Sequence, residues 1–246
     1  MSHARITAIL LAAGVGRRLD QPQPKVLAKM GDSSLLARHL ALLAEAGVDT
    51  LSITIGYEGE TIRRAVREAG SALDIRFVEN ERFREGSLGS LWRQADLLRA
   101  GDTILLMDGD VLYDRRMFER LLAAPGEAVM LVDRNIEPGD EPVKICFRGP
   151  TIVDFRKRPE HAHDWHGESV GFFRFSPAMA AALADRCDVY ERSGHLPEYE
   201  EAIRDLILRD PASFQACDVS DLPWTEIDFP EDLARARASI LPRLVS

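Results

Sequence analysis

Two stretches of the chain carry residue types that can bind a nucleoside triphosphate. The first reads Leu11-Ala12-Ala13-Gly14-Val15-Gly16-Arg17-Arg18-Leu19 and is followed by Pro24-Lys25. Glycines after a buried strand let the backbone turn sharply and present N–H groups to phosphate oxygens. Arginine and lysine side chains beside them add charge-assisted hydrogen bonds to a triphosphate. We therefore expect a phosphate-binding loop, although a purely structural turn can contain the same glycines.

Two other glycine-rich loops fit this stretch less well. A dinucleotide-binding loop needs a third glycine where this chain has Leu19, and a helix must follow it directly. A P-loop ends in G-K-[ST], which the stretch does not contain.

The second stretch, Met107-Asp108-Gly109-Asp110-Val111, follows an apolar run. The carboxyl ends of strands are where open α/β sheets bind their ligands. Carboxylates at such a place can hold Mg²⁺, which prefers oxygen ligands and bridges phosphates. The metal would neutralise charge that develops during attack at an α-phosphate. The alternative interpretation is an exposed polar turn.

The elements that position these residues follow from the hydrophobic periodicity. In the first half, strands are expected over 6–11, 50–55, 75–78 and 103–107, and helices over 33–46, 60–68 and 87–98. This alternation predicts right-handed βαβ units and a mostly parallel sheet. In the second half we expect a hairpin of 143–147 with 151–155, a strand over 170–175, and helices over 177–184, 199–208 and 230–240.

The predicted fold class is therefore α/β, a Rossmann-like, mostly parallel mixed sheet flanked by helices. We expect a single domain over 1–246, with a nucleotide-binding half at about 1–125 and an acceptor-binding half at about 126–246.

Composition excludes several classes of protein. The 246 residues carry a net charge of −9, which argues against nucleic acid as a partner. The three cysteines are widely spaced and suit reduced thiols in the cytoplasm. The apolar run over 6–13 is better explained as a buried strand than as a signal peptide, and no run is long enough for a membrane span. We expect a cytoplasmic protein without a membrane or nucleic-acid partner.

The glycine-rich stretch, taken whole, resembles a known signature. L-A-A-G-x-G-x-R-[LM] followed by P-K is typical of nucleotidyltransferases related to the sugar-1-phosphate nucleotidyltransferases. Because the chain is short, it looks most similar to the compact phosphocholine, inositol-1-phosphate and aminoethylphosphonate cytidylyltransferases. A molybdopterin-type transferase fits less well, since that group usually has L-A-G-G and D-K at these places.

The resemblance implies a role for each residue of the loop. Arg18 would reach the β- and γ-phosphates and Lys25 would stabilise charge at the α-phosphate, so these two are the candidate catalytic residues. Arg17 stands where the family usually has Ser or Thr. The residues implied to contact the nucleotide are Leu11, Ala12, Ala13, Gly14 and Gly16.

A late segment, Trp224-Thr225-Glu226-Ile227-Asp228-Phe229-Pro230-Glu231-Asp232-Leu233, resembles the family's E-[IV]-D-[TF]-P-E-D-L. The aspartate of that motif completes the metal site, so the resemblance implies Asp110 and Asp228 as ligands of Mg²⁺. Asp108 would face the nucleotide. The two ligands are far apart in the sequence, so their meeting is a geometric prediction.

Members of this family recognise the nucleotide base with a loop that corresponds to residues 85–92. Ser87, Gly89 and Ser90 are the candidates here, and the alternative for one serine is a helix cap. The family more often has G-T-[AG] at this place.

The acceptor is expected to bind to the second half. The candidates are Lys144, Lys157, Arg158, Glu168 and Gly171, with a solvated surface as the alternative for each basic residue. Trp165, Tyr190 and Trp224, with Glu168 or Glu198, could form an aromatic, anionic pocket for an alkylammonium group, although core packing is the alternative. His161, His163 and His166 are interpreted as parts of a solvated loop.

The expected reaction is the transfer of a nucleotidyl group from CTP to a small phospho-alcohol or phosphonate, with release of pyrophosphate. One alternative is a sugar-1-phosphate nucleotidyltransferase that uses UTP, GTP or dTTP. The alternative of another class is a non-catalytic nucleotide-binding protein with a regulatory or scaffold role. The oligomeric state is left open, with a homodimer as one option.

Overall fold

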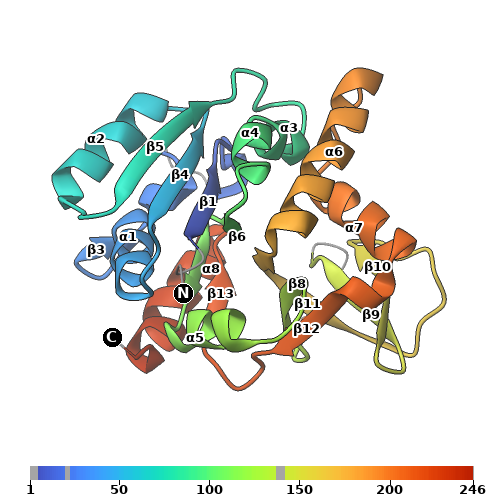
Figure 1. Ribbon diagram of the computed structural model, residues 1–246. Helices are drawn as coiled ribbons and strands as arrows, with labels where there is room; N and C mark the ends of the chain where they lie inside the picture. The colour runs from blue at the N-terminus through green and yellow to red at the C-terminus, as the bar shows by residue number, and fades with distance from the viewer. Residues whose placement is uncertain (1–4, 20–22, 137–141, 246) are drawn as a thin grey trace.

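The computed structural model describes residues 5–19, 23–136 and 142–245. Strands and helices alternate through the first half, as predicted (Figure 1). The strands are β1 (Ile6–Ala12), β2 (Lys29–Met30), β3 (Ser33–Ser34), β4 (Thr50–Ile55), β5 (Asp74–Glu79), β6 (Thr103–Asp108), β7 (Val111–Tyr113), β8 (Ala128–Asp133), β9 (Lys144–Arg148), β10 (Thr151–Arg156), β11 (Trp165–Phe175), β12 (Phe214–Asp218) and β13 (Trp224–Glu226). The α-helices are α1 (Leu35–Glu45), α2 (Gly59–Ala69), α3 (Ser87–Trp92), α4 (Ala95–Leu98), α5 (Arg116–Ala123), α6 (Pro177–Ser193), α7 (Glu200–Arg209) and α8 (Pro230–Arg235).

One large sheet runs through both halves of the chain. Its strand order is β10-β9-β11-β6-β1-β4-β5, and β8 pairs with both β11 and β12. The strands β6, β1, β4 and β5 are parallel, whereas β11 is antiparallel to β6, β8 and β9. The predicted α/β class with a mixed sheet flanked by helices is confirmed. The division into a nucleotide-binding and an acceptor-binding half stays a prediction.

Helices cover both faces of the sheet, and β1 shows why. Ala8 and Leu10 pack on one face with α1, α2 and α5, whereas Ile9 packs on the other face with α3, α4, α6 and α7. All three side chains are fully buried. In Figure 1, α1 and α2 lie beside β4 and β5, and α6 and α7 lie on the opposite side of the molecule. A strand that is covered on both faces has a continuous apolar sequence, and β1 was predicted from this feature.

Several elements differ from the prediction. The helix expected over 87–98 is divided into α3 and α4 around Gln94, whose side chain bonds to Ser52 and Thr54 of β4. The strand β11 and the helix α6 are longer than expected, and the C-terminal helix continues beyond Arg235 as a π-helical turn. The elements β2, β3, β7, α5, β8, β12 and β13 were not predicted, and β3 takes the first two residues of the helix expected over 33–46.

The sheet brings the two candidate stretches to one edge. Leu11 at the end of β1 pairs with Asp108 at the end of β6, so the glycine-rich loop and the Gly109–Asp110 turn emerge together. The small ribbon of β7 and β13 pairs Val111 with Glu226 and carries the late segment to the same edge.

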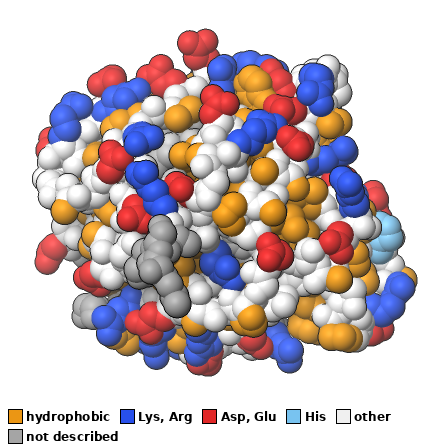
Figure 2. All heavy atoms as spheres, viewed as in Figure 1, with side chains coloured by type: hydrophobic (Ala, Val, Ile, Leu, Met, Phe, Trp, Pro, Cys, Tyr) orange, Lys and Arg blue, Asp and Glu red, His pale blue; other side chains and the backbone are white. Residues whose placement is uncertain are grey.

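Within the part of the chain that the structure describes, no helix has the length and apolar character to cross a membrane. All three cysteines are free thiols. On the face shown in Figure 2, basic and acidic side chains are interspersed.

Candidate active site

The glycine-rich loop forms the wall of a cavity of about 370 Å³. Gly16 adopts a left-handed φ of 62°, and a side chain there would lie 2.6 Å from Cγ of Lys25. Glycine at this position therefore lets the lysine pass close to the loop. The cavity is lined by the predicted residues Leu11, Ala12, Gly14, Gly16, Arg18, Lys25 and Asp110, and also by Arg17, Val26 and Gly109.

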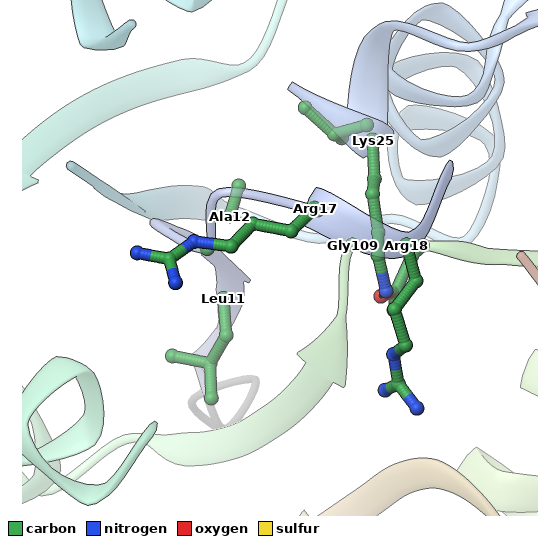
Figure 3. A pocket seen from close by; sticks show the side chains of 10 residues that line it. Leu11, Ala12, Arg17, Arg18, Lys25 and Gly109 are labelled. Atoms are coloured by element: carbon green, nitrogen blue, oxygen red, sulfur yellow. The ribbon is translucent and has the colours of Figure 1, made fainter. Parts of the chain in front are cut away.

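Lys25 joins residues from three parts of the chain. Its Nζ donates to Oδ2 of Asp110 at 2.9 Å and also to Oδ1 of Asp228. Arg18 Nη2 donates to Oδ2 of Asp228 at 2.9 Å. Burial by itself lowers the pKa of Lys25, but the two carboxylates outweigh it and hold this pKa above its ordinary range. Lys25 is therefore an ammonium at neutral pH. Figure 3 shows Lys25 and Arg18 extending in the same direction and Arg17 extending to the other side.

The predicted meeting of Asp110 and Asp228 is present in the structure, together with a third carboxylate. Glu226 joins them, and one carboxylate oxygen from each residue lies within 4.8 Å of the others. Desolvation within the cluster, followed by the charges of Asp110 and Asp228, raises the pKa of Glu226, although part of its side chain is exposed. Three hard oxygen donors at this separation fit Mg²⁺. In the described part of the chain, this is the one cluster of acidic, histidine or cysteine side chains with such spacing.

Glu226 was missed in the sequence, although a signal was present. Side chains two residues apart on an extended chain point to the same side, so the Glu226-Ile227-Asp228 spacing directs both carboxylates one way. The backbone N–H of Ile227 donates to the carbonyl of Asp110 at 2.9 Å, which aligns the segment with the turn after β6. The resemblance implies a metal-binding role for the aspartate of this motif and not for its glutamate.

Asp108 faces the second half of the molecule. Its Oδ2 accepts a hydrogen bond from the hydroxyl of Tyr199 at 2.7 Å. Burial, and then the charge of Asp110, raises the pKa of Asp108 well above its ordinary value. Gly171 has a left-handed φ of 77°, and a side chain there would overlap the carboxylate of Asp108. Gly171 therefore allows β11 to approach Asp108, and both residues line a second cavity of about 710 Å³.

A buried histidine supports the turn between the two aspartates. His39 on α1 is fully buried, with Nε2 3.1 Å from the carbonyl of Gly109 and Nδ1 3.3 Å from the hydroxyl of Tyr113. Burial lowers the pKa of His39 to about 4, so the ring is neutral at pH 7. A side chain at Gly109 would lie 2.8 Å from the carbonyl oxygen of Leu11, which accounts for the glycine.

The expected base-reading residues take three different positions. Ser87 Oγ donates to Glu198 at 2.5 Å and accepts from the backbone N–H of Tyr199 at 2.9 Å. Ser90 is buried and accepts from Nδ2 of Asn80 at 3.0 Å. Gly86 occupies the N-cap position of α3, so the suggestion that one serine caps this helix was wrong.

Of these candidates, Ser87, Ser90 and Ala13 line the larger cavity. Gly89 instead packs toward Leu196 and Asn80. Contact of any of them with a base stays a prediction.

The acceptor candidates divide into two groups. Lys157, Glu168 and Gly171 line the larger cavity. Lys144 and Arg158 are not among the residues that line it, and contact of either with the acceptor stays a prediction. Lys144 lies on β9 and donates to the carbonyl of Lys157 at 2.9 Å, beneath the loop that carries Lys157. Arg158 follows Lys157 and is exposed.

The suggested aromatic pocket is not assembled. Trp165 stacks on Phe147 with ring centroids 4.0 Å apart, and the hydroxyl of Tyr190 donates to Asp205 at 2.7 Å. Only Trp224 of the three lines the cavity, and its Nε1 donates to Asp133 at 2.8 Å. Both acidic candidates, Glu168 and Glu198, do line the cavity.

The histidine-rich segment does not form a metal site. His163 Nε2 lies 3.1 Å from Nδ1 of His166, and His161 Nδ1 lies 3.2 Å from Oδ2 of Asp154. All three rings contact protein groups, and His166 lies on β11, so only His161 and His163 belong to a loop.

Comparison with known proteins agrees with this arrangement. Residues 8–172 match the MobA-like NTP transferase domain. The chain belongs to this family. The match to this NTP transferase domain ends within β11, so Glu226 and Asp228 lie outside it.

Two curated relatives match nearly the whole of this transferase. The CMP-5'-(3-aminopropyl)phosphonate synthase of Streptomyces rubellomurinus is 26% identical over 94% of this chain and 38% of its own length. The bifunctional IPC transferase and DIPP synthase of Rubrobacter xylanophilus is 27% identical over 96% of this chain and 52% of its own length. The transferase thus spans about half the length, or less, of these relatives.

A solved structure shows the same fold. The CTP:phosphocholine cytidylyltransferase of Streptococcus pneumoniae superposes with a TM-score of 0.73 at 18% identity, over 95% of this chain and 98% of its own.

Proposed function

We propose that this transferase is a magnesium-dependent cytidylyltransferase that joins the CMP part of CTP to a small phospho-alcohol or phosphonate and releases pyrophosphate. The observation that carries the proposal is the position of Lys25, whose ammonium contacts Asp110 and Asp228 beside the glycine-rich loop. CTP and the acceptor class are supported by the names of the relatives, which include a CMP-phosphonate synthase and a CTP:phosphocholine cytidylyltransferase.

The chain's own residues would hold the triphosphate in a reactive position. Backbone N–H groups of the loop around Gly14 and Gly16 would bind phosphate oxygens, and Arg18 would bind the β- and γ-phosphates. Lys25 would place its charge at the α-phosphate, where negative charge increases in the transition state. Asp110, Glu226 and Asp228 would hold Mg²⁺, which when bound neutralises charge on the phosphates.

The transfer itself needs no covalent intermediate on the protein. A phosphate or phosphonate oxygen of the acceptor attacks the α-phosphorus and forms a new P–O bond. The bond from the α-phosphorus to the bridging oxygen breaks, and that oxygen leaves as part of pyrophosphate. The attacking oxygen is already anionic, so the protein contributes positioning and charge stabilisation. Asp108 would face the nucleotide from the acceptor side, where Tyr199 holds its carboxylate.

The direct test is a pyrophosphate-release assay that crosses CTP, UTP, GTP and ATP with phospho-alcohols, phosphonates and sugar-1-phosphates, in Mg²⁺ and in EDTA. We expect release with CTP and a phospho-alcohol or phosphonate, in Mg²⁺ only. Release with a sugar-1-phosphate and another triphosphate would contradict the substrate assignment. Absence of release with every pair would favour the non-catalytic alternative. The cytoplasmic location and a homodimer stay predictions.

A further inference from the structure

We infer that Glu200 recognises a primary ammonium group on the acceptor, so that the acceptor is an aminoalkyl phosphate or phosphonate. The inference rests on the proposed nucleotidyl transfer and names the substrate class for the same site.

Glu200 differs from the other glutamates of its segment in having an unused carboxylate oxygen. Glu198 accepts hydrogen bonds from the backbone N–H and the hydroxyl of Ser87. Glu201 forms an ion pair with Arg156 at 3.0 Å. The Oε2 atom of Glu200 is buried and has no hydrogen-bond partner among the described residues. A buried carboxylate oxygen without a donor is unfavourable, so this position suits a group that brings N–H or O–H donors.

The position of Glu200 connects it to the reaction centre. Glu200 is the first residue of α7 and lines the cavity of about 710 Å³. Lys25, Asp110 and Asp228 line the same cavity. Asp108 lines this cavity too, and its carboxylate accepts a hydrogen bond at 2.7 Å from the hydroxyl of Tyr199, the residue that precedes Glu200. An acceptor whose anionic end reaches the reaction centre can therefore place its other end at Glu200.

The chemistry of the cavity favours a primary ammonium over other end groups. A quaternary ammonium has no N–H to donate and is usually held by aromatic faces. Two of the three aromatic residues suggested for such a pocket, Trp165 and Tyr190, are engaged elsewhere. Trp224 and Tyr199 line the cavity, but each is held by a hydrogen bond to an aspartate, Asp133 and Asp108 respectively. Glu168 and Glu198 line the cavity with Glu200, which favours a cation over a neutral hydroxyl. Burial raises the pKa of Glu200 to about 7, and a bound ammonium would stabilise its ionised form.

The test compares acceptors that differ only in the amine. Pyrophosphate release from CTP is measured with 2-aminoethylphosphonate and ethylphosphonate, and with phosphoethanolamine, phosphocholine and glycerol phosphate. For the wild-type chain we expect kcat/KM to be at least about tenfold higher for 2-aminoethylphosphonate than for ethylphosphonate. The same preference is expected for phosphoethanolamine over phosphocholine and over glycerol phosphate. In Glu200→Gln, kcat/KM for the aminated acceptor should fall about tenfold, mainly through KM, whereas the slow reaction of ethylphosphonate should not change. Glu68→Gln, at an exposed position of α2, is the control.

The outcomes separate this inference from the proposed function. Equal rates with and without the amine, preference for phosphocholine, or an equal loss for both acceptors in Glu200→Gln would overturn the inference and leave nucleotidyl transfer standing. Thermal unfolding of Glu200→Gln shows whether the fold is intact, and calorimetric titration with 2-aminoethylphosphonate then reports binding without turnover. No pyrophosphate from any pair would overturn the proposed function and the inference together.

Discussion

The ammonium nitrogen of Lys25 lies 2.9 Å from a carboxylate oxygen of Asp110, across the gap between the loop after β1 and the turn after β6. Asp228 contacts the same nitrogen from the late segment. The three residues are only partly exposed, so their charges act on one another through little solvent. The arrangement places the positive charge of Lys25 between two carboxylates, with Arg18 on the outer side of Asp228, at the edge of the sheet where a triphosphate would enter.

Replacement of Lys25 by alanine should lower kcat by about 10²–10³-fold, the loss typical for one group that stabilises transition-state charge. KM for CTP should change less. Steady-state pyrophosphate release measures both constants. Lys29→Ala, at an exposed position of β2, is the matched control and should keep wild-type kinetics. An unchanged kcat in Lys25→Ala would remove this residue from the mechanism.

Replacement of Glu226 by glutamine should weaken the use of Mg²⁺. The variant keeps the side-chain shape but loses a carboxylate that would be ionised when Mg²⁺ is bound, so the Mg²⁺ concentration for half-maximal rate should rise about tenfold or more. Titration of the rate with Mg²⁺ measures this shift. Glu231→Gln, on the exposed first turn of α8, should titrate as wild type does. The same midpoint in both variants would show that Glu226 is not a ligand.

Replacement of Gly171 by alanine should reduce both stability and activity. Alanine must adopt the left-handed φ of 77°, and its methyl group must displace the carboxylate of Asp108. Gly47 offers a matched control, because it has a φ of 73° with no atom within 4 Å of an added methyl group. Gly47→Ala should lose about 1 kcal/mol of unfolding free energy from backbone strain alone and keep its activity.

Urea unfolding and the pyrophosphate-release assay are applied to both glycine variants. Together they separate the effect of backbone strain from the effect of displacing the Asp108 carboxylate. Gly171→Ala should lose more unfolding free energy than Gly47→Ala and should also lose activity. Equal stability losses with full activity in both would show that Asp108 tolerates the methyl group.

Asp154 is expected to make the fold sensitive to acid. Its carboxylate is fully buried and accepts from Arg204 Nε at 2.6 Å and from the backbone N–H groups of Glu160 and His161. Burial alone would raise the pKa of Asp154, but Arg204 and the N–H donors hold it well below its ordinary value. A depressed pKa means that the stabilisation is complete above the unfolded-state pKa of about 4 and is lost as the pH falls toward the folded-state value.

The corresponding experiment is urea unfolding of wild type and Asp154→Asn at pH 7 and pH 3. At pH 7 the variant should be less stable by about 3–5 kcal/mol, because Arg204 loses its buried partner. At pH 3 the difference should be smaller. A difference that stays constant between the two pH values would contradict this explanation.

The local features of the sequence predicted the first half well. Apolar runs marked β1 and β6 because helices cover both faces of the sheet there. The division of the helix after Gly86 was missed because it depends on Gln94, whose partners Ser52 and Thr54 lie on a distant strand. The spacing of apolar residues along a helix depends on the local sequence, so it cannot show a contact with a distant strand.

Most residues of the candidate site that belong to a recognisable sequence motif were predicted. Asp110 and Asp228 were expected to meet, and the pairing of β7 with β13 brings them together. The contact of Lys144 with the carbonyl of Lys157 could not be predicted, because the sequence does not show to which side a strand residue directs its side chain. Glu200 was not singled out, since its buried oxygen depends on how α7 packs against the cavity.

The central claim is transfer of the CMP group to an acceptor, and ³¹P NMR of the complete reaction tests it most directly. With CTP, Mg²⁺ and 2-aminoethylphosphonate or phosphoethanolamine, we predict equal amounts of pyrophosphate and of a new product in which the acceptor phosphorus is bridged through oxygen to the CMP phosphorus. Asp110→Asn should form neither product at a comparable rate. Hydrolysis of CTP without the bridged product, or no reaction of CTP with any acceptor, would contradict the account.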